Sequence, residues 1–119
     1  MEKFVSQYSE SRPWGTFHVL DESKGFKVKR IVVKEGGRLS LQSHKHRSEH
    51  WTVIEGKATV TVDDKVVVMS RGEAVDIPLQ AKHRLENLHE GKVTIIEVQF
   101  GSYLGEDDII RYDDAYARA

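Results

Sequence analysis

Apolar and polar residues alternate with a period of two through most of this 119-residue chain. Side chains of a β-strand point alternately to its two faces, so this period is typical of strands that cover a core on one face. Nine β-branched or aromatic runs, bounded by glycines or acidic pairs, predict strands at residues 14–20, 26–33, 39–46, 50–54, 58–62, 65–69, 74–77, 83–88 and 93–100. Asp63-Asp64 predicts a tight hairpin between two of them. The pattern predicts an all-β, antiparallel jelly-roll barrel.

Composition fits one globular domain. Hydrophobic residues make up 39% and charged residues 31%, and the net charge of -1 gives no reason to expect nucleic acid or an anionic membrane as a partner. Cysteine is absent, which excludes disulfides and thiolate chemistry. No apolar run is long enough to span a bilayer, and the first ten residues lack an apolar signal core, so a cytoplasmic location is expected. A helical turn is expected near 106–118.

A polar stripe runs along the predicted strand at 39–46 and the residue before it. Its two leucines share one face, and the other face collects Arg38, Ser40, Gln42, His44 and His46. Such a stripe faces either bulk solvent or a polar cavity. Histidines two residues apart aim both imidazoles at one point, which favours a cavity. Glu97 and Gln99 repeat the pattern on the last strand, so we expect two strands to line a pocket.

Histidines and carboxylates gather around this stripe in a pattern typical of a metal site. His44 and His46 offer two ligands from one strand, a carboxylate just beyond offers a third, and the distant His83 completes the set. Imidazole and carboxylate suit a divalent first-row metal, and three or four protein ligands with an open position indicate a catalytic site. We expect one such ion: zinc, with iron, manganese, cobalt and nickel as alternatives.

These residues resemble the two cupin motifs. The first motif, His-x-His followed by Glu, six residues and Gly, is matched by His44, His46, Glu49 and Gly56. The second is matched by Gly72, Pro78, His83 and Asn87, with Gln80 standing where the pattern has glycine. The resemblance implies the cupin double-stranded β-helix, as a single domain over residues 1–119 with its core barrel at about 26–100, and the N-terminal strand and C-terminal tail packed on it.

The third ligand has two candidates, because the gap after His46 is one residue shorter than usual. Counting forward from His46 reaches His50, and counting back from Gly56 reaches Glu49. Glu49 is favoured, since the strand before the glycine has a fixed period and the preceding turn can absorb a deletion. His50 is then a pocket residue.

The chain also resembles the type II mannose-6-phosphate isomerase cupin, usually the C-terminal domain of a bifunctional protein with a mannose-1-phosphate guanylyltransferase. Here the domain is expected to be free-standing, because 119 residues cannot house the other activity. Blocks that carry the resemblance begin at residues 12, 26, 39, 83 and 96: R-P-W-G-T-F-H-V-L, F-K-V-K-R-I-V-V-K, L-S-L-Q-S-H-K-H-R-S-E-H-W, H-R-L-E-N and I-E-V-Q-F-G-S-Y-L-G-E-D-D-I-I-R-Y-D-D. Lys45 stands where the family has a further histidine.

The resemblance implies interconversion of mannose 6-phosphate and fructose 6-phosphate, in the synthesis of polysaccharide precursors, with the sugar phosphate as partner. The metal acts as a Lewis acid and a base moves a proton between C1 and C2. The base has three candidates, His50, Glu97 and Glu49. Arg47 is the first choice for holding the phosphate. The other residues expected to contact substrate are Gln42, Lys45, Lys82 and Arg84.

Two other functions stay open at this point: a non-catalytic module that binds sugar phosphates or sugar nucleotides beside a separate guanylyltransferase, and a metal-dependent oxygenase. Residues 12–15 and 101–108 are interpreted as structural closures, with Tyr103 as a candidate for entering the pocket. Small sheet-rich domains often hide their edge strands by pairing, so a homodimer is expected.

Overall fold

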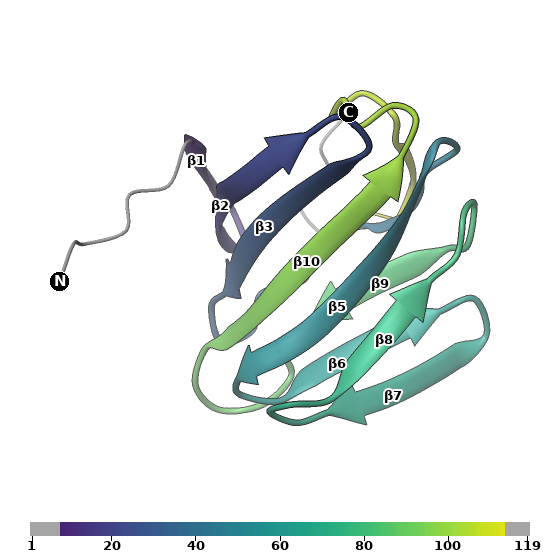
Figure 1. Ribbon diagram of the computed structural model, residues 1–119. Coiled ribbons are helices and arrows are strands. Elements are labelled where there is room, and N and C mark those ends of the chain that lie inside the picture. Colours follow the sequence, from purple (N-terminus) through teal and green to yellow (C-terminus); the bar gives the residue numbers. More distant parts are fainter. Residues whose placement is uncertain (1–7, 114–119) are drawn as a thin grey trace, which may run out of the picture.

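The computed structural model describes residues 8–113, which form two antiparallel β-sheets facing each other (Figure 1). The six-stranded sheet has the order β1 (Tyr8–Arg12), β2 (Gly15–Ser23), β3 (Phe26–Val33), β10 (Val93–Gly101), β5 (Arg47–Glu55), β8 (Ala74–Ile77). The five-stranded sheet has the order β11 (Ile110–Asp113), β4 (Leu41–Ser43), β9 (His83–Glu86), β6 (Ala58–Val62), β7 (Lys65–Met69). The all-β jelly roll expected from the sequence is confirmed.

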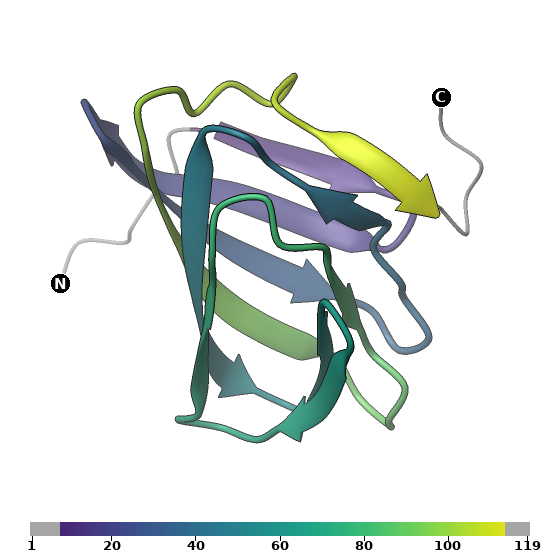
Figure 2. The same ribbon diagram turned by 90° about the vertical axis from the view of Figure 1, so that its right-hand side faces the viewer.

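Four predicted strands match observed strands residue for residue. β3, β6, β7 and β8 have the predicted bounds, and Asp63-Asp64 forms the two-residue turn that pairs Val62 with Lys65. Two largely exposed edge strands, β1 and β11, were not expected. β11 lies beside β4 (Figure 2) and takes part of the tail for which a helical turn was predicted. Residues 114–118 of that prediction lie outside the described residues.

No helix among the described residues 8–113 is long and apolar enough to cross a membrane.

The space between the sheets is apolar toward one end and polar toward the other. Along β10 the buried residues change from Val93 and Ile95 to Glu97 and Gln99. On the two neighbouring strands, Lys29 of β3 lies opposite Glu97 and Glu49 of β5 lies opposite Gln99. The apolar end contains the hydrophobic core: Trp14, Ile31, Val33, Trp51, Val53, Val60, Met69, Ile77 and Leu85, among others. Three adjacent strands thus stop contributing apolar side chains near the same level, and the loop that follows β10 crosses between the sheets at the polar end (Figure 2).

Three positions of the sequence motifs have special backbone conformations or backbone contacts. Gly56 has φ 82°, and a Cβ there would lie 2.4 Å from the carbonyl oxygen of Lys92, so only glycine fits. Asn87 is fully buried and donates from Nδ2 to backbone carbonyl oxygens at 3.1 and 2.7 Å. Gln80 has φ 66° and therefore adopts the left-handed conformation that the usual glycine would take without strain.

Candidate functional site

Three buried side chains meet inside the polar end: His44, Glu49 and His83. One potential ligand atom from each lies within 4.8 Å of the others. The Glu49 carboxylate lies between the imidazoles, with Oε2 3.3 Å from His44 Nε2 and Oε1 3.7 Å from His83 Nε2. Glu49 comes from β5 and His83 from β9, whereas His44 directly follows β4, so the site joins both sheets.

Backbone carbonyls fix both imidazoles with Nε2 toward Glu49. His44 Nδ1 donates to the carbonyl oxygen of Asp108 at 2.6 Å, and His83 Nδ1 donates to that of Ala81 at 3.0 Å. Burial and the nearby positive charge of Arg47 lower the pKa of His44 to about 4, and burial lowers the pKa of His83. Both rings are therefore neutral near pH 7, each with a lone pair on Nε2.

This donor set fits a divalent first-row metal ion. Two neutral imidazoles and one carboxylate are ligands that zinc and its neighbours accept, and three protein ligands leave positions open for substrate or water. The hydrogen bond at the far nitrogen of each ring is the usual support of a ligating histidine. His44, Glu49 and His83 are thus the residues that would hold the ion.

The guanidinium of Arg47 contacts the same atoms. Its Nε donates to Glu49 Oε2 at 2.8 Å and its Nη2 donates to His44 Nε2 at 3.1 Å. The remaining nitrogen, Nη1, is buried, has no hydrogen bond among the described residues, and lies 3.6 Å from Glu106 Oε2. Arg47 thus neutralises the Glu49 carboxylate. Its Nη1 group, on the side of Glu106, makes no hydrogen bond among the described residues.

Glu97 is the second buried carboxylate of the site. Trp51 Nε1 donates to Glu49 Oε1 at 2.9 Å and to Glu97 Oε1 at 3.0 Å, and Gln99 Nε2 donates to Glu97 Oε2 at 2.9 Å. Burial, together with the adjacent charge of Glu49, raises the pKa of Glu97 to about 7. A carboxyl group with such a pKa can accept and return a proton near neutrality.

A pocket of about 100 Å³ lies at the polar end, and a smaller cavity of about 30 Å³ adjoins it. The two share Ile31, Leu39, Gln42 and Glu97, and the smaller one is also lined by Glu49 and His83. The larger pocket contains four cationic and two acidic side chains: Arg12, Lys29, Arg47, Arg111, Glu97 and Glu106. The excess of cations favours an anionic ligand.

Comparison with known families matches residues 2–114 to the model described as "Mannose-6-phosphate isomerase C-terminal". The chain belongs to this family. Curated relatives include the xanthan biosynthesis protein XanB of Xanthomonas campestris pv. campestris strain B100, 50% identical over 90% of this chain and 23% of XanB. A mannose-1-phosphate guanylyltransferase of Escherichia coli O157:H7 is 46% identical over 96% of this chain and 24% of its own length. The chain therefore spans about a quarter of these relatives.

Solved structures agree on the fold of this family member. The Cnp3 cupin domain of Schizosaccharomyces pombe superposes with a TM-score of 0.70 at 17% identity, covering 72% of this chain and 64% of that one. A cupin-superfamily sugar phosphate isomerase from Silicibacter pomeroyi gives a TM-score of 0.65 at 22% identity, covering 71% of this chain and 58% of that one. At such identities the likeness shows the cupin fold alone.

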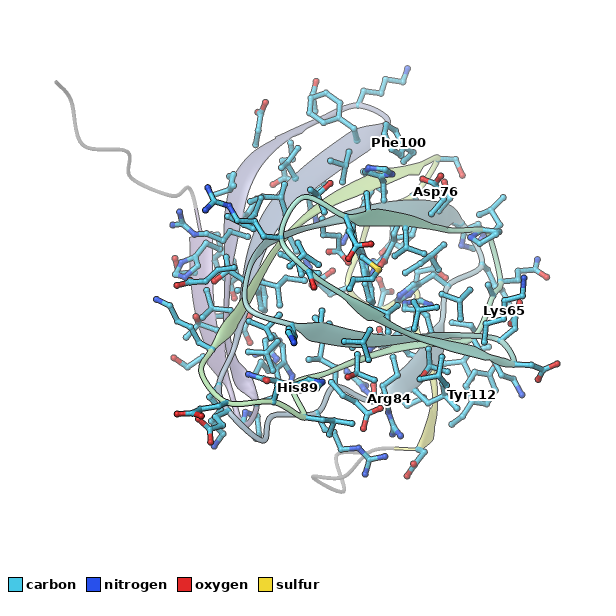
Figure 3. All side chains as sticks on the ribbon, turned by 90° about the horizontal axis from the view of Figure 1, so that it is seen from below. Lys65, Asp76, Arg84, His89, Phe100 and Tyr112 are labelled. Atoms are coloured by element: carbon cyan, nitrogen blue, oxygen red, sulfur yellow. The ribbon has the colours of Figure 1, made fainter. Side chains whose placement is uncertain are left out.

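Of the two candidates for the third ligand, the structure places Glu49 with the histidines and His50 on the other face of β5. Arg47, Glu49 and Trp51 alternate inward, so His50 faces outward. There its Nδ1 lies 2.6 Å from Oδ1 of Asp76, a largely exposed residue on the outer side of the six-stranded sheet (Figure 3). The structure does not bring His50 to the pocket, which leaves Glu97 and Glu49 of the three candidates for the base.

His46 does not join His44 either. β4 ends at Ser43, so the period of two on which the pairing of the two histidines rested does not continue. The His46 side chain is 52% exposed, and its Nδ1 lies 3.4 Å from Oδ1 of Asp108. The carboxylate of Asp108 also accepts the backbone N–H groups of Lys45 and His46 at 3.0 and 2.9 Å, which fixes the turn.

The residues expected to contact substrate separate into two groups. Gln42 and Arg47 line the larger pocket, and Arg84 lines the smaller cavity but donates to the backbone carbonyl of Leu39 and to Asp113. Lys45 and Lys82 are exposed and line neither, and Lys82 Nζ lies 4.3 Å from the ring centroid of Tyr112. Figure 3 shows Arg84 and Tyr112 on the side opposite Asp76.

Sequence reasoning missed four charged residues of the pocket: Arg12, Lys29, Glu106 and Arg111. The signal for Lys29 was present, because it shares a strand face with the core residues Ile31 and Val33. Tyr103 lines neither cavity; it is half-exposed, bonds to Asp107, and lies on a separate surface groove.

Proposed function

We propose that this domain is a metal-dependent isomerase that interconverts mannose 6-phosphate and fructose 6-phosphate. Membership of the mannose-6-phosphate isomerase C-terminal family supports the reaction class. The xanthan and alginate biosynthesis proteins among its relatives support a role in polysaccharide precursor synthesis. The cytoplasmic location, the homodimer and the choice of zinc stay predictions.

The observation that carries the proposal is the order of charged groups along two adjoining cavities. Gln42 and Glu97 line both the cationic pocket and the cavity beside Glu49 and His83. A sugar phosphate whose anionic end contacts the cations therefore extends its other end toward the ligand trio and Glu97. An aldose phosphate carries its carbonyl at the end opposite to the phosphate. Its phosphate would therefore lie at the cations when its carbonyl lies near the ligand trio and Glu97.

The reaction moves hydrogen between adjacent carbons. On conversion of the aldose to the ketose, the hydrogen on C2 is transferred to C1 and the proton of the C2 hydroxyl passes to the C1 oxygen. Glu97 takes the proton from one carbon and returns it to the next, while Trp51 and Gln99 hold its carboxylate in place. A bound divalent ion would supply Lewis acidity toward the substrate oxygens. Gln42 offers an amide that orients a sugar hydroxyl.

The test is conversion of mannose 6-phosphate to fructose 6-phosphate by purified, metal-loaded protein, followed in a coupled assay. We expect turnover that is lost on chelation and restored by added metal. Glu97→Gln should lower kcat by at least about a hundredfold and leave metal content intact, because general-base catalysis contributes at least that factor. Saturable binding of mannose 6-phosphate without turnover would instead make the domain a binding module, and oxygen consumption with a co-substrate would make it an oxygenase.

A further inference from the structure

One loop carboxylate lies between two buried cations of the pocket. Glu106, on the loop between β10 and β11, places Oε1 2.5 Å from Lys29 Nζ and Oε2 3.6 Å from Arg47 Nη1. Each of the two cationic side chains is 7% exposed, whereas that of Glu106 is 50% exposed. An accessible carboxylate thus lies in ion-pair range of two buried cations, one from β3 and one from β5.

The two cations are costly to bury, and neither Lys29 Nζ nor Arg47 Nη1 has an ion-pair partner besides Glu106 among the described residues, although the other nitrogens of Arg47 bind Glu49 and His44. Lys29 Nζ makes its one hydrogen bond in the described residues to Glu106 and otherwise lies 4.5 Å from the ring centroid of Phe17. Arg47 Nη1 has no hydrogen bond there. Removing a charged group from water is unfavourable unless charges and hydrogen bonds compensate for it. A buried, unsatisfied N–H beside a lysine is compensated when an anion of several oxygens binds.

Lys27 shows what a purely structural lysine on the same strand face looks like. It is two residues from Lys29, is also buried (9% exposed against 5%), and its Nζ donates to the backbone carbonyl of Leu104 at 3.0 Å. That partner belongs to the backbone, and Lys27 does not line the pocket. Lys27 Nζ also lies 3.7 Å from Oε2 of Glu22, which does not line the pocket. Lys29 differs because its one hydrogen bond in the described residues goes to an exposed side chain that lines the pocket.

We propose that Lys29 and Arg47 form the seat of a phosphomonoester, and that Glu106 occupies this seat until the ligand displaces its carboxylate. The ligand class rests on the proposed function, but the anion seat does not depend on turnover. A phosphate offers three oxygens and nearly two charges in place of one carboxylate. Glu106 therefore lowers the affinity for phosphate esters. When no phosphate ester is bound, Glu106 keeps the two cations paired.

The experiment measures binding of mannose 6-phosphate, inorganic phosphate and mannose by calorimetry, with chelator present so that no turnover occurs. We expect Glu106→Gln to tighten both phosphate ligands about five- to tenfold, because the competing charge is removed while the loop keeps its length. Lys29→Met should weaken them by at least about tenfold. Mannose should bind equally weakly to all variants.

Matched controls come from the same elements. Asp107→Asn removes the neighbouring loop charge, which contacts Tyr103, and Lys27→Met removes the neighbouring strand lysine; neither should change phosphate affinity. Glu106 is half-exposed, so its variant stays testable even if Lys29→Met fails to fold. Unchanged or weaker phosphate binding by Glu106→Gln overturns the proposal. Isomerase activity without that tightening rejects the seat alone, whereas tightening without isomerase activity rejects the proposed reaction alone.

Discussion

Arg47 donates from Nη2 to His44 Nε2 over 3.1 Å, so a fixed positive charge contacts the lone pair that a metal ion would use. The same guanidinium also binds Glu49. A metal ion and this guanidinium therefore compete for two of the three ligating groups.

Replacing Arg47 by Met should tighten metal binding. Hydrogen bonds to charged groups are worth about 1.5–3 kcal/mol, so removing the competitor should raise the affinity for zinc by about tenfold or more. Calorimetric titration of the chelator-stripped protein measures this. Arg84→Met is the control, because Arg84 is also buried but bonds to Leu39 and Asp113. Weaker metal binding by Arg47→Met would show that Arg47 supports the site instead.

Glu49 and His50 are adjacent but face opposite sides of β5, so single variants separate their roles. Glu49→Gln should lower metal affinity by more than about a hundredfold, because a charged ligand is lost. His50→Gln should leave metal content unchanged and break only the surface contact with Asp76. Metal analysis of the purified variants decides, and an empty site in His50→Gln alone would reverse the assignment.

His46 gives a parallel comparison with His44. His44 is buried in the trio, whereas His46 is half-exposed against Asp108. We expect His44→Gln to lose bound metal and His46→Gln to retain it at one ion per chain. Retention of metal by neither variant would mean that the turn at 44–46 rearranges when the ion binds.

The pH dependence of stability should reveal two opposing buried groups. His44 has a pKa of about 4 when folded and 6.5 as its ordinary value, so between these values only the unfolded chain binds the proton. The contribution of His44 to the free energy of unfolding of the metal-free protein therefore falls by about 3 kcal/mol as the pH drops from 6.5 to 4. Glu97, with its pKa raised from 4.5 to about 7, acts in the opposite direction and loses stability as pH rises.

Glu97→Gln removes the second contribution and should make the metal-free protein gain stability more steeply between pH 4.5 and 6.5 than the unmodified chain does. Burial also lowers the pKa of His83, so His83 likewise makes the folded state more stable as the pH rises. Urea unfolding at three pH values measures the slopes. Parallel profiles for the two proteins would contradict the raised pKa of Glu97.

Gln80 offers a test of backbone strain. Its φ of 66° costs a side-chain-bearing residue about 1 kcal/mol or more, so Gln80→Gly should stabilise the domain by about that amount. Gln80→Ala is the control, because it shortens the side chain but keeps the Cβ. Thermal unfolding compares the three proteins, and equal midpoints for Gly and Ala would show that no strain is stored here.

The strand pattern was predictable because alternation is a local property. The sequence did not indicate β1 and β11, because both are short, largely exposed edge strands: β1 is mostly polar, and the two apolar residues of β11, Ile110 and Tyr112, are too few to establish a period. His46 was misplaced for a different reason: its turn depends on Asp108, more than sixty residues further along the chain. Lys29 was visible in the alternation, but its partner Glu106 lies 77 residues away, and no local pattern connects the two.

The interior between the sheets is apolar at one end of β3, β5 and β10 and polar at the other, and this division affects how the domain can evolve. Val33, Val53 and Val93 maintain the fold from one end, while Lys29, Glu49 and Glu97 sit at the other. Substitutions at the second set change the charges that face a ligand but leave the apolar contacts of the first set in place, so this barrel can acquire a new specificity without rebuilding its hydrophobic core.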